Sequence, residues 1–202
     1  MTDTALTDLS PLEAMRSIIQ RIATGPELSK NLSLEETCYG MEQILQGHID
    51  PAQAAIFLIA LRMKRETDDE NKGILQAIRN NTQRVTAKVD HVIDIADPYN
   101  GNNRTLSAAP FLPAVLGALG CPTISHGLDS VSPKHGLTYR HIFQAAGIPV
   151  DLTPQQAADK LSKKDIGWAY IDQAQFCPQL HDLVDFRTLV VKRTALTTVE
   201  VM

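Results

Sequence analysis

The chain has 202 residues, 44% of them hydrophobic, and a formal net charge of −4 at pH 7. This length and composition allow a substantial buried core, in one domain or in two unequal ones. The mildly acidic balance excludes a protein that is basic overall and coats nucleic acid, although a local basic groove remains compatible with it.

Targeting and redox features are weak. The sequence lacks a run of about 18 apolar residues, as a membrane-spanning helix would need. Its first segment, MTDTALTDLSPLEAM, has neither the basic nor the apolar region of a secretion signal. The cysteines at positions 38, 121 and 177 are too far apart to indicate a disulfide framework or a zinc site. We therefore expect a soluble cytoplasmic protein with no membrane association.

The first 80 or so residues show the spacing of helices. Three capping boxes begin at Ser10, Ser33 and Thr67, each with a glutamate three residues later. A fourth start combines Asp50 with Pro51, where the missing N–H donor of proline costs nothing. Apolar residues follow each start at helical spacing, so we predict four short antiparallel helices packed together.

After residue 81 the pattern alternates between strands and helices. Strands are predicted at residues 89–95, 122–125, 150–152 and 166–171, and helices at 107–119, 139–146 and from 154 onward. Such alternation implies right-handed crossovers and a parallel sheet, with ligands near the carboxyl ends of the strands. The predicted fold class is α/β, with a small all-helical domain at residues 1–84 and a mainly parallel, incomplete α/β domain at 85–202.

A family resemblance covers nearly all of the chain after about residue 30. The segments LSLEETCYGMEQILQGHIDPAQAAIFLIALRMKRETDDE, SHGLDSVSPKHG, GIPVDLTPQQAADKL and FCPQLHDLVDFRTLVVKRT carry it. They resemble the anthranilate phosphoribosyltransferases, members of glycosyltransferase family 3, and the related pyrimidine nucleoside phosphorylases. The resemblance implies a pentosyltransferase fold, magnesium if the protein is catalytic, and a homodimer formed by the N-terminal helices, for which we expect Leu45, Ile49, Phe57 and Ile59 to supply apolar surface.

The loop after the first strand departs from that family. The transferases have a Gly-Thr-Gly-Gly-Asp loop there, whose bare backbone wraps the pyrophosphate of phosphoribosyl pyrophosphate. This chain has Asp-Pro-Tyr-Asn-Gly at residues 97–101, in which Pro98 removes one donor and Tyr99 adds bulk. The pattern is similar to a divergent second branch of the family, which includes nucleic-acid-binding homologues.

Polar residues around this loop form the predicted phosphate or phosphoribosyl side of the site, namely Asp97, Asn100, Gly101, Arg104, Thr105 and Ser107. Arg104 can clamp a phosphate with two parallel hydrogen bonds, next to a helix start that favours anions. The resemblance assigns Ser107 to the binding of magnesium. The alternative interpretation is an ordinary Asn-Gly turn followed by a solvated loop.

The predicted acceptor side comprises His126, Gly127, Lys134, Gly136 and Arg187. A neutral His126 can donate to a ligand or act as an acid or base, although a lone histidine is more often structural. In the family an arginine contacts the aromatic acid, and the resemblance assigns this role to Arg187 or Arg193. The alternative interpretation is that these residues form a solvated basic surface. Leu128 stands where the family has an asparagine that faces anthranilate, so we expect a different acceptor.

Two classes of function follow. The first is a phosphoribosyltransferase-type protein that binds phosphoribosyl pyrophosphate or another phosphate-bearing ligand and works by positioning and electrostatics. The second is a non-catalytic homologue that binds nucleic acid or another polyanion through its basic residues. Family members continue well past the position of Met202 with further strands and an Asp-Glu pair that holds magnesium. The resemblance thus implies a C-terminally truncated form with an exposed apolar sheet edge.

Overall fold

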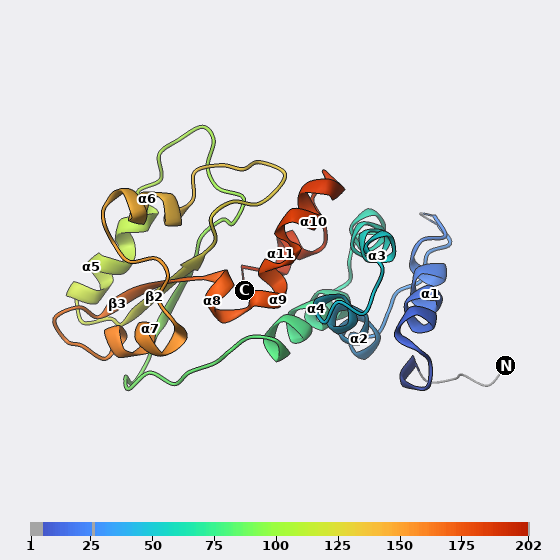
Figure 1. Cartoon of the computed structure of the whole chain (residues 1–202), viewed down its shortest axis with the longest axis horizontal. Coiled ribbons are helices and arrows are strands. Elements are labelled where there is room, and N and C mark those ends of the chain that lie inside the picture. Colours follow the sequence, from blue (N-terminus) through green and yellow to red (C-terminus); the bar gives the residue numbers. More distant parts are fainter. Residues whose placement is uncertain (1–5, 26, 202) are drawn as a thin grey trace. The chain divides into compact units, whose positions relative to one another are not determined.

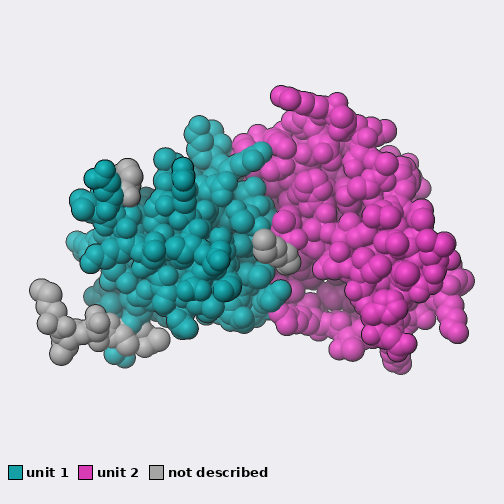
Figure 2. Space-filling view, turned by 180° about the vertical axis from the view of Figure 1, so that it is seen from behind, with its two compact units in different colours: residues 1–81, 185–200, 202 teal, residues 82–184, 201 magenta. Residues whose placement is uncertain are grey.

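The computed structural model describes residues 6–25 and 27–201, which form two compact units. Unit 1 comprises residues 1–81 and 185–200, and unit 2 comprises residues 82–184 and 201 (Figure 2). The sequence predicts two domains that are each continuous in the chain, with a boundary between residues 84 and 85. In the structure, residues 185–200 instead belong to the helical unit. No helix in the described residues is long and apolar enough to cross a membrane.

Unit 1 is helical (Figure 1). Its elements are the 3-10 turn η1 (Leu6–Asp8) and the helices α1 (Pro11–Ile22), α2 (Leu34–Leu45), α3 (Pro51–Lys64), α4 (Asp68–Asn80) and α11 (Leu196–Val199), with most of α10 (Leu183–Val190). The three predicted capping boxes are present at Ser10, Ser33 and Thr67, and Asp50 caps α3. The predicted helix starts are therefore confirmed.

The core of unit 1 corrects one expectation. Of the residues expected to supply apolar surface for a dimer, Leu45, Ile49 and Phe57 are buried inside the unit, whereas Ile59 is half-buried. Glu70 is also fully buried. Its carboxylate accepts hydrogen bonds from the backbone of Leu32 and from Lys64, so the charge is paired inside the unit.

The segment 185–200 belongs to unit 1 and carries a buried ion pair of its own. Both terminal guanidinium nitrogens of Arg187 donate to the carboxylate of Glu200, and both residues are buried. The backbone N–H of Ala195 also donates to the carbonyl of Leu58 on α3. Residues of this segment thus join the helical core, although they follow the α/β part in sequence.

Unit 2 is built on a three-stranded parallel sheet in the order β1-β2-β3. The strands are β1 (Ile93–Ala96), β2 (Thr123–Gly127) and β3 (Trp168–Asp172). The helical elements are η2 (Ala109–Phe111), α5 (Leu112–Ala118), α6 (Tyr139–Ala145), α7 (Pro154–Leu161), α8 (Gln173–Phe176) and α9 (Pro178–His181). The predicted fold class, a small helical domain with a parallel α/β region, is confirmed.

Some predicted boundaries shift. The first strand begins at Ile93 instead of residue 89, and the helix predicted at 107–119 starts as a 3-10 turn around Pro110 before α5. Residues 150–152 form no strand and do not pair with the sheet, so the strand predicted there is wrong. Each of these segments is short, which makes the apolar pattern ambiguous.

The two faces of the sheet are covered by different helices (Figure 1). Tyr170 packs with Tyr139 and Phe143 of α6 on one face, whereas Ala169 and Ile171 pack toward α7 on the other. The carboxyl ends of β1 and β2 lead into the two loops in which the sequence predicts the site. The sheet therefore places both loops at one edge.

Candidate functional site

Two loops at the carboxyl ends of β1 and β2 join into one structure, here called the loop pair, residues 97–105 and 128–138. Asn102 and Leu137 form an isolated antiparallel bridge, with reciprocal backbone hydrogen bonds of 2.9 and 3.0 Å. The N–H of Gly136 donates to the carbonyl of Asn100 at 3.0 Å. The structure therefore brings together the two segments that the sequence assigns to opposite sides of a ligand.

Gly101 and Gly136 make this close approach possible. Gly101 has a φ of 70°, a conformation that residues with a side chain rarely adopt. A Cβ atom on either glycine would overlap the backbone of the other loop. Both predicted glycines thus serve the contact between the loops, and neither forms an open cradle for a phosphate.

Tyr99, His126 and Asp94 contact one another in series at the base of the loop pair. Nε2 of His126 lies 3.2 Å from a carboxylate oxygen of Asp94, and the hydroxyl of Tyr99 lies 2.5 Å from Nδ1. In the tautomer that carries its proton on Nε2, the nitrogen next to the carboxylate, Nδ1 is the acceptor and the phenol donates to it. Both ring nitrogens of His126 are therefore engaged, and the imidazole orients Tyr99.

The ring of Tyr99 is buried against Leu128 and Val131. Tyr99 belongs to the first loop and Leu128 to the second, so two departures from the transferase motifs are in contact with each other. The aromatic ring of Tyr99 fills space next to Leu128 that a glycine at position 99 would leave open. Together the two residues close the base of the loop pair with apolar side chains.

Asp97 does not line the outer surface of the loops. Its side chain is fully buried, and Oδ2 accepts a 2.7 Å hydrogen bond from the backbone N–H of Tyr139, the first residue of α6. Burial raises the pKa of the Asp97 carboxyl to about 7, and the hydrogen bond from Tyr139 opposes that rise. Gly127 lies beside it, because a Cβ on Gly127 would meet the Asp97 side chain at 2.9 Å.

The outer surface of the loop pair carries the exposed polar groups. Arg104, Thr105 and Lys134 are exposed, and the side-chain amide of Asn103 donates to the backbone carbonyl of Lys134 at 3.2 Å. Among residues 97–105 and 128–138 the acidic side chains are the buried Asp97 and the exposed Asp129, which lies beside His141. The surface around Arg104 and Lys134 is therefore locally positive.

The resemblance assigns Ser107 to the binding of magnesium, and the surroundings of Ser107 show whether they suit such an ion. The Ser107 hydroxyl oxygen accepts a hydrogen bond from the N–H of Ala109 at the start of η2. Magnesium prefers carboxylate and phosphate oxygens, and the described residues contain no cluster of three or more side chains suited to a metal ion. The described part of the chain does not by itself fit a protein-held magnesium ion, which remains an expectation from the family.

Arg187 belongs to unit 1, and its guanidinium is already occupied by Glu200. A ligand carboxylate would have to displace Glu200 to use the same donors. Lys192 and Arg193 of the same segment are exposed. The expectation that Arg187 faces an acceptor therefore finds no support in this conformation, because the side chain serves the packing of α10 on α11.

A second polar cluster lies at the carboxyl end of β3, and sequence reasoning missed it. A cavity of about 290 Å³ is lined by Asp129, Arg140, Gln144, Asp151, Asp172, Ala174 and His181. Arg140 bridges Asp172 at 3.0 Å and Asp151 at 2.7 Å, so its charge is balanced within the cluster. Sequence reasoning missed Asp94 as well. Asp94 alternates with the apolar residues of β1, so it lies on the same face of the sheet as His126 of β2.

Comparison with known proteins decides the family. A family model described as glycosyl transferase family, helical bundle domain, matches residues 16–82. Anthranilate phosphoribosyltransferase of Ruminiclostridium cellulolyticum is 31% identical over 84% of this chain and 47% of its own length. That of Acetivibrio thermocellus is 30% identical over 77% and 44%. The chain belongs to the anthranilate phosphoribosyltransferase-like family of glycosyl transferases.

Solved structures of the anthranilate phosphoribosyltransferases share the fold. The Thermus thermophilus protein superimposes with a TM-score of 0.76 at 18% identity, covering 93% of this chain and 54% of that one. The Saccharomyces cerevisiae protein in complex with PRPP and Mg superimposes with a TM-score of 0.71 at 14% identity and the same coverage. The chain spans about half the length of the curated relatives it matches.

Proposed function

We propose that this chain is a phosphoribosyltransferase-type protein that binds a phosphate-bearing ligand, phosphoribosyl pyrophosphate or another polyphosphate, on the outer surface of its loop pair. The observation that supports the proposal is the joining of the two loops, in which Arg104 and Lys134 are both exposed. Arg104 would supply a bidentate charged contact, and Asn102 and Asn103 neutral donors.

The mode of binding differs from a glycine cradle. The base of the loop pair is closed by Tyr99 and Leu128, so a phosphate would rest against side chains instead of bare backbone N–H groups. Binding by exposed charged side chains is weak and sensitive to salt. We propose no step that involves a metal ion, since the described residues offer no carboxylate set for one.

Anthranilate is not the proposed acceptor. Leu128 is fully buried in the apolar cluster with Tyr99 and Val131, and it offers no hydrogen-bond donor or acceptor in its side chain. A site built to hold an aromatic acid needs polar partners for its carboxylate. Incubation with phosphoribosyl pyrophosphate and anthranilate should give no fluorescent product above a control without protein.

Titration of pyrophosphate tests the proposed site. A charge-assisted contact contributes roughly 1.5 to 3 kcal/mol, so Arg104→Ala should weaken binding by about ten-fold or more. Arg104→Lys should weaken binding less than Arg104→Ala, because lysine keeps the charge but lacks the two parallel N–H donors of the guanidinium group. Arg84→Ala is the matched control, since Arg84 is an exposed arginine of the same unit outside the loop pair.

Equal affinity of the wild type and Arg104→Ala for pyrophosphate would contradict the proposal. A short single-stranded oligonucleotide is the second probe. If the oligonucleotide binds through Arg104 and pyrophosphate does not bind, the loop pair is a surface for nucleic acid. The proposal that it binds phosphoribosyl pyrophosphate or another polyphosphate is then wrong.

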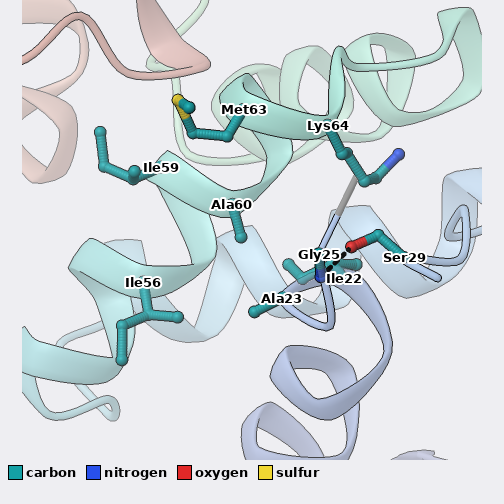
Figure 3. A pocket seen from close by; sticks show the side chains of 9 residues that line it. All are labelled: Ile22, Ala23, Gly25, Ser29, Ile56, Ile59, Ala60, Met63 and Lys64. Atoms are coloured by element: carbon teal, nitrogen blue, oxygen red, sulfur yellow. Dashed lines mark hydrogen bonds between the residues drawn. The ribbon is translucent and has the colours of Figure 1, made fainter. Parts of the chain in front are cut away.

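For the assembly, we propose that a second copy of the chain covers an apolar groove of unit 1 between α3 and the end of α1. The groove has a volume of about 320 Å³ and is lined mostly by Ile22, Ala23, Ile56, Ile59, Ala60 and Met63. Figure 3 shows Ala60 of α3 pointing toward Ile22 and Ala23, while Ile59 and Met63 extend from α3 away from these two residues. The spacing of residues 56, 59, 60 and 63 puts them on one helix face, and such an exposed apolar face is typical of an interface.

A copy of the same chain fits this groove because its rim carries little charge. Lys64, the charged residue that lines it, is already paired with the buried Glu70. Met63 is 77% exposed and Ile56 is 45% exposed, so the surface is available to a partner. A two-fold contact would place α3 of one copy against the same groove of the other, which buries both apolar faces at once.

A further inference from the structure

Asp97 connects the two loops from beneath. It is the first residue of the first loop, and its carboxyl group accepts the N–H of Tyr139, the residue that directly follows the second loop. Tyr139 is also the first residue of α6, whose side chains pack on the sheet. One buried side chain therefore holds the end of β1, the end of the second loop and the start of a helix together.

The surroundings of Asp97 suit a neutral carboxyl group better than a charged one. Its Oδ1 atom is buried without a hydrogen-bond partner in the described structure, and so is the hydroxyl of Tyr170. The Tyr170 hydroxyl and Asp97 Oδ2 would each lie 3.2 Å from a Cβ placed on Gly127, so the missing side chain of Gly127 leaves room for both groups. A buried, partly unpaired carboxylate is costly to ionise.

The charged neighbours do not supply a counter-ion. On α6, Arg140 pairs with Asp172 and Asp151, and His141 pairs with Asp129. On β3, burial raises the pKa values of Tyr170 and Asp172, and Asp172 and Asp97 raise that of Tyr170 further. On β2, His126 projects to the opposite face, where Asp94 lies. With its pKa raised to about 7, Asp97 therefore changes charge close to neutral pH.

We propose that Asp97 is a proton-controlled tie within the loop pair, which keeps the loops and the first turn of α6 closed when neutral and loosens them when ionised. Ionisation strengthens the hydrogen bond that Oδ2 accepts from Tyr139, but burial of the charge is the larger effect, because the ionised Oδ1 atom needs a donor or a water molecule that the packed site does not provide. Where the proposed function holds, this tie also regulates it. Ionisation then weakens anion binding, because it loosens the loops and places a negative charge beneath them.

The tie is tested without any ligand by NMR of the whole chain labelled with ¹³C at aspartate carboxyl carbons. The Asp97 signal, assigned by its absence in Asp97→Asn, should titrate with a midpoint near the pKa of about 7. The amide proton of Tyr139 should follow the same midpoint, and this shift should vanish in Asp97→Asn. It should persist in His141→Asn and in Asp90→Asn, which remove a histidine of α6 and an exposed carboxylate of the same unit.

Two results would overturn the tie. One is an Asp97 carbon that titrates like an exposed carboxyl, at about pH 4. The other is a Tyr139 amide proton that does not respond when Asp97 titrates.

The link to ligand binding has a separate test. Sulfate is a suitable probe because its charge does not change between about pH 6 and about pH 8. These two pH values lie below and above the expected midpoint of the Asp97 titration. We expect the wild type to bind sulfate several-fold more tightly at the lower pH and Asp97→Asn to show no such difference. Equal wild-type affinities at both pH values would overturn the regulation. If sulfate binds at neither pH, the proposed function fails, whereas the tie is still decided by the Asp97 and Tyr139 signals.

Discussion

At the scale of single residues, the loop pair depends on side chains whose roles are not evident from residue type. Tyr99 adds bulk to a loop in which relatives have glycine, and in the structure this bulk packs on Leu128 while the hydroxyl binds His126. The sequence indicates the bulk but not the partner, because the contact joins residues far apart in the chain. Asp97 looks like a ligand-binding carboxylate in sequence and lies in the interior in the structure.

Removing the hydroxyl of Tyr99 should destabilise unit 2 with little change in packing. Tyr99→Phe keeps the ring but leaves Nδ1 of His126 without this donor, at a cost of about 1 to 3 kcal/mol. Urea unfolding measures the change. Tyr39→Phe is the control, because Tyr39 is half-buried and outside the loop pair. Equal losses in the two variants would mean that the Tyr99–His126 hydrogen bond contributes nothing specific.

Asp97 should make stability depend on pH. Its folded pKa of about 7 lies above the ordinary value of 3.8, so the folded state favours the neutral form. This contribution is complete below about pH 4 and is lost as the pH rises through about 7. Asp97→Asn should therefore gain stability relative to the wild type as the pH rises through that range. Parallel stability curves for the two proteins, measured by urea unfolding, would contradict this.

At the scale of elements, local signals predict helix starts well and tertiary partners poorly. Each capping box lies within four residues, so the sequence at Ser10, Ser33 and Thr67 contains the whole interaction. The start of β1 depends on where pairing with β2 begins, which no local pattern records. The return of residues 185–200 to unit 1 involves contacts between residues far apart in the chain, such as the hydrogen bond from the Ala195 N–H to the Leu58 carbonyl. Arg187 and Glu200 within this segment are buried, although arginine and glutamate in sequence look like surface residues.

The Arg187–Glu200 pair should be essential to the packing of α10 on α11. Glu200→Ala leaves the buried guanidinium without its counter-ion, and a broken buried pair costs about 3 to 5 kcal/mol. Lys72→Ala, which removes an exposed pair with Asp69, should cost about 0.5 kcal/mol or less. Denaturant unfolding compares the two variants. A small loss in Glu200→Ala would show that water reaches Arg187.

At the scale of the whole molecule, the chain combines a helical bundle domain with an α/β part, and together they span about half the length of its relatives. The family and the fold class were predictable because helix caps, alternation and motif segments extend along most of the sequence. Of the four residues expected at a dimer surface, Leu45, Ile49 and Phe57 are buried, whereas Ile59 lines the groove together with the exposed Ile56 and Met63.

Self-association should depend on the groove of unit 1. Met63→Asp places a charge where two apolar faces would meet, so it should shift the protein toward the monomer. Leu189→Asp introduces the same charge at an exposed residue outside the groove and should leave the association unchanged. Analytical ultracentrifugation at micromolar concentration distinguishes these outcomes. A wild type that sediments as a monomer would refute the dimer.

The most direct test of the central claim is a ¹H–¹⁵N NMR titration of the ¹⁵N-labelled chain with pyrophosphate. We expect the largest shifts at the amides of Asn102, Asn103 and Arg104 and at those of Lys134 and Gly136, which form the joined loops. The same shifts should weaken in Arg104→Ala and at higher salt. Shifts that are absent from both loops at saturating pyrophosphate, or that are unchanged in Arg104→Ala, would contradict the proposal that the loop pair is the phosphate-binding site.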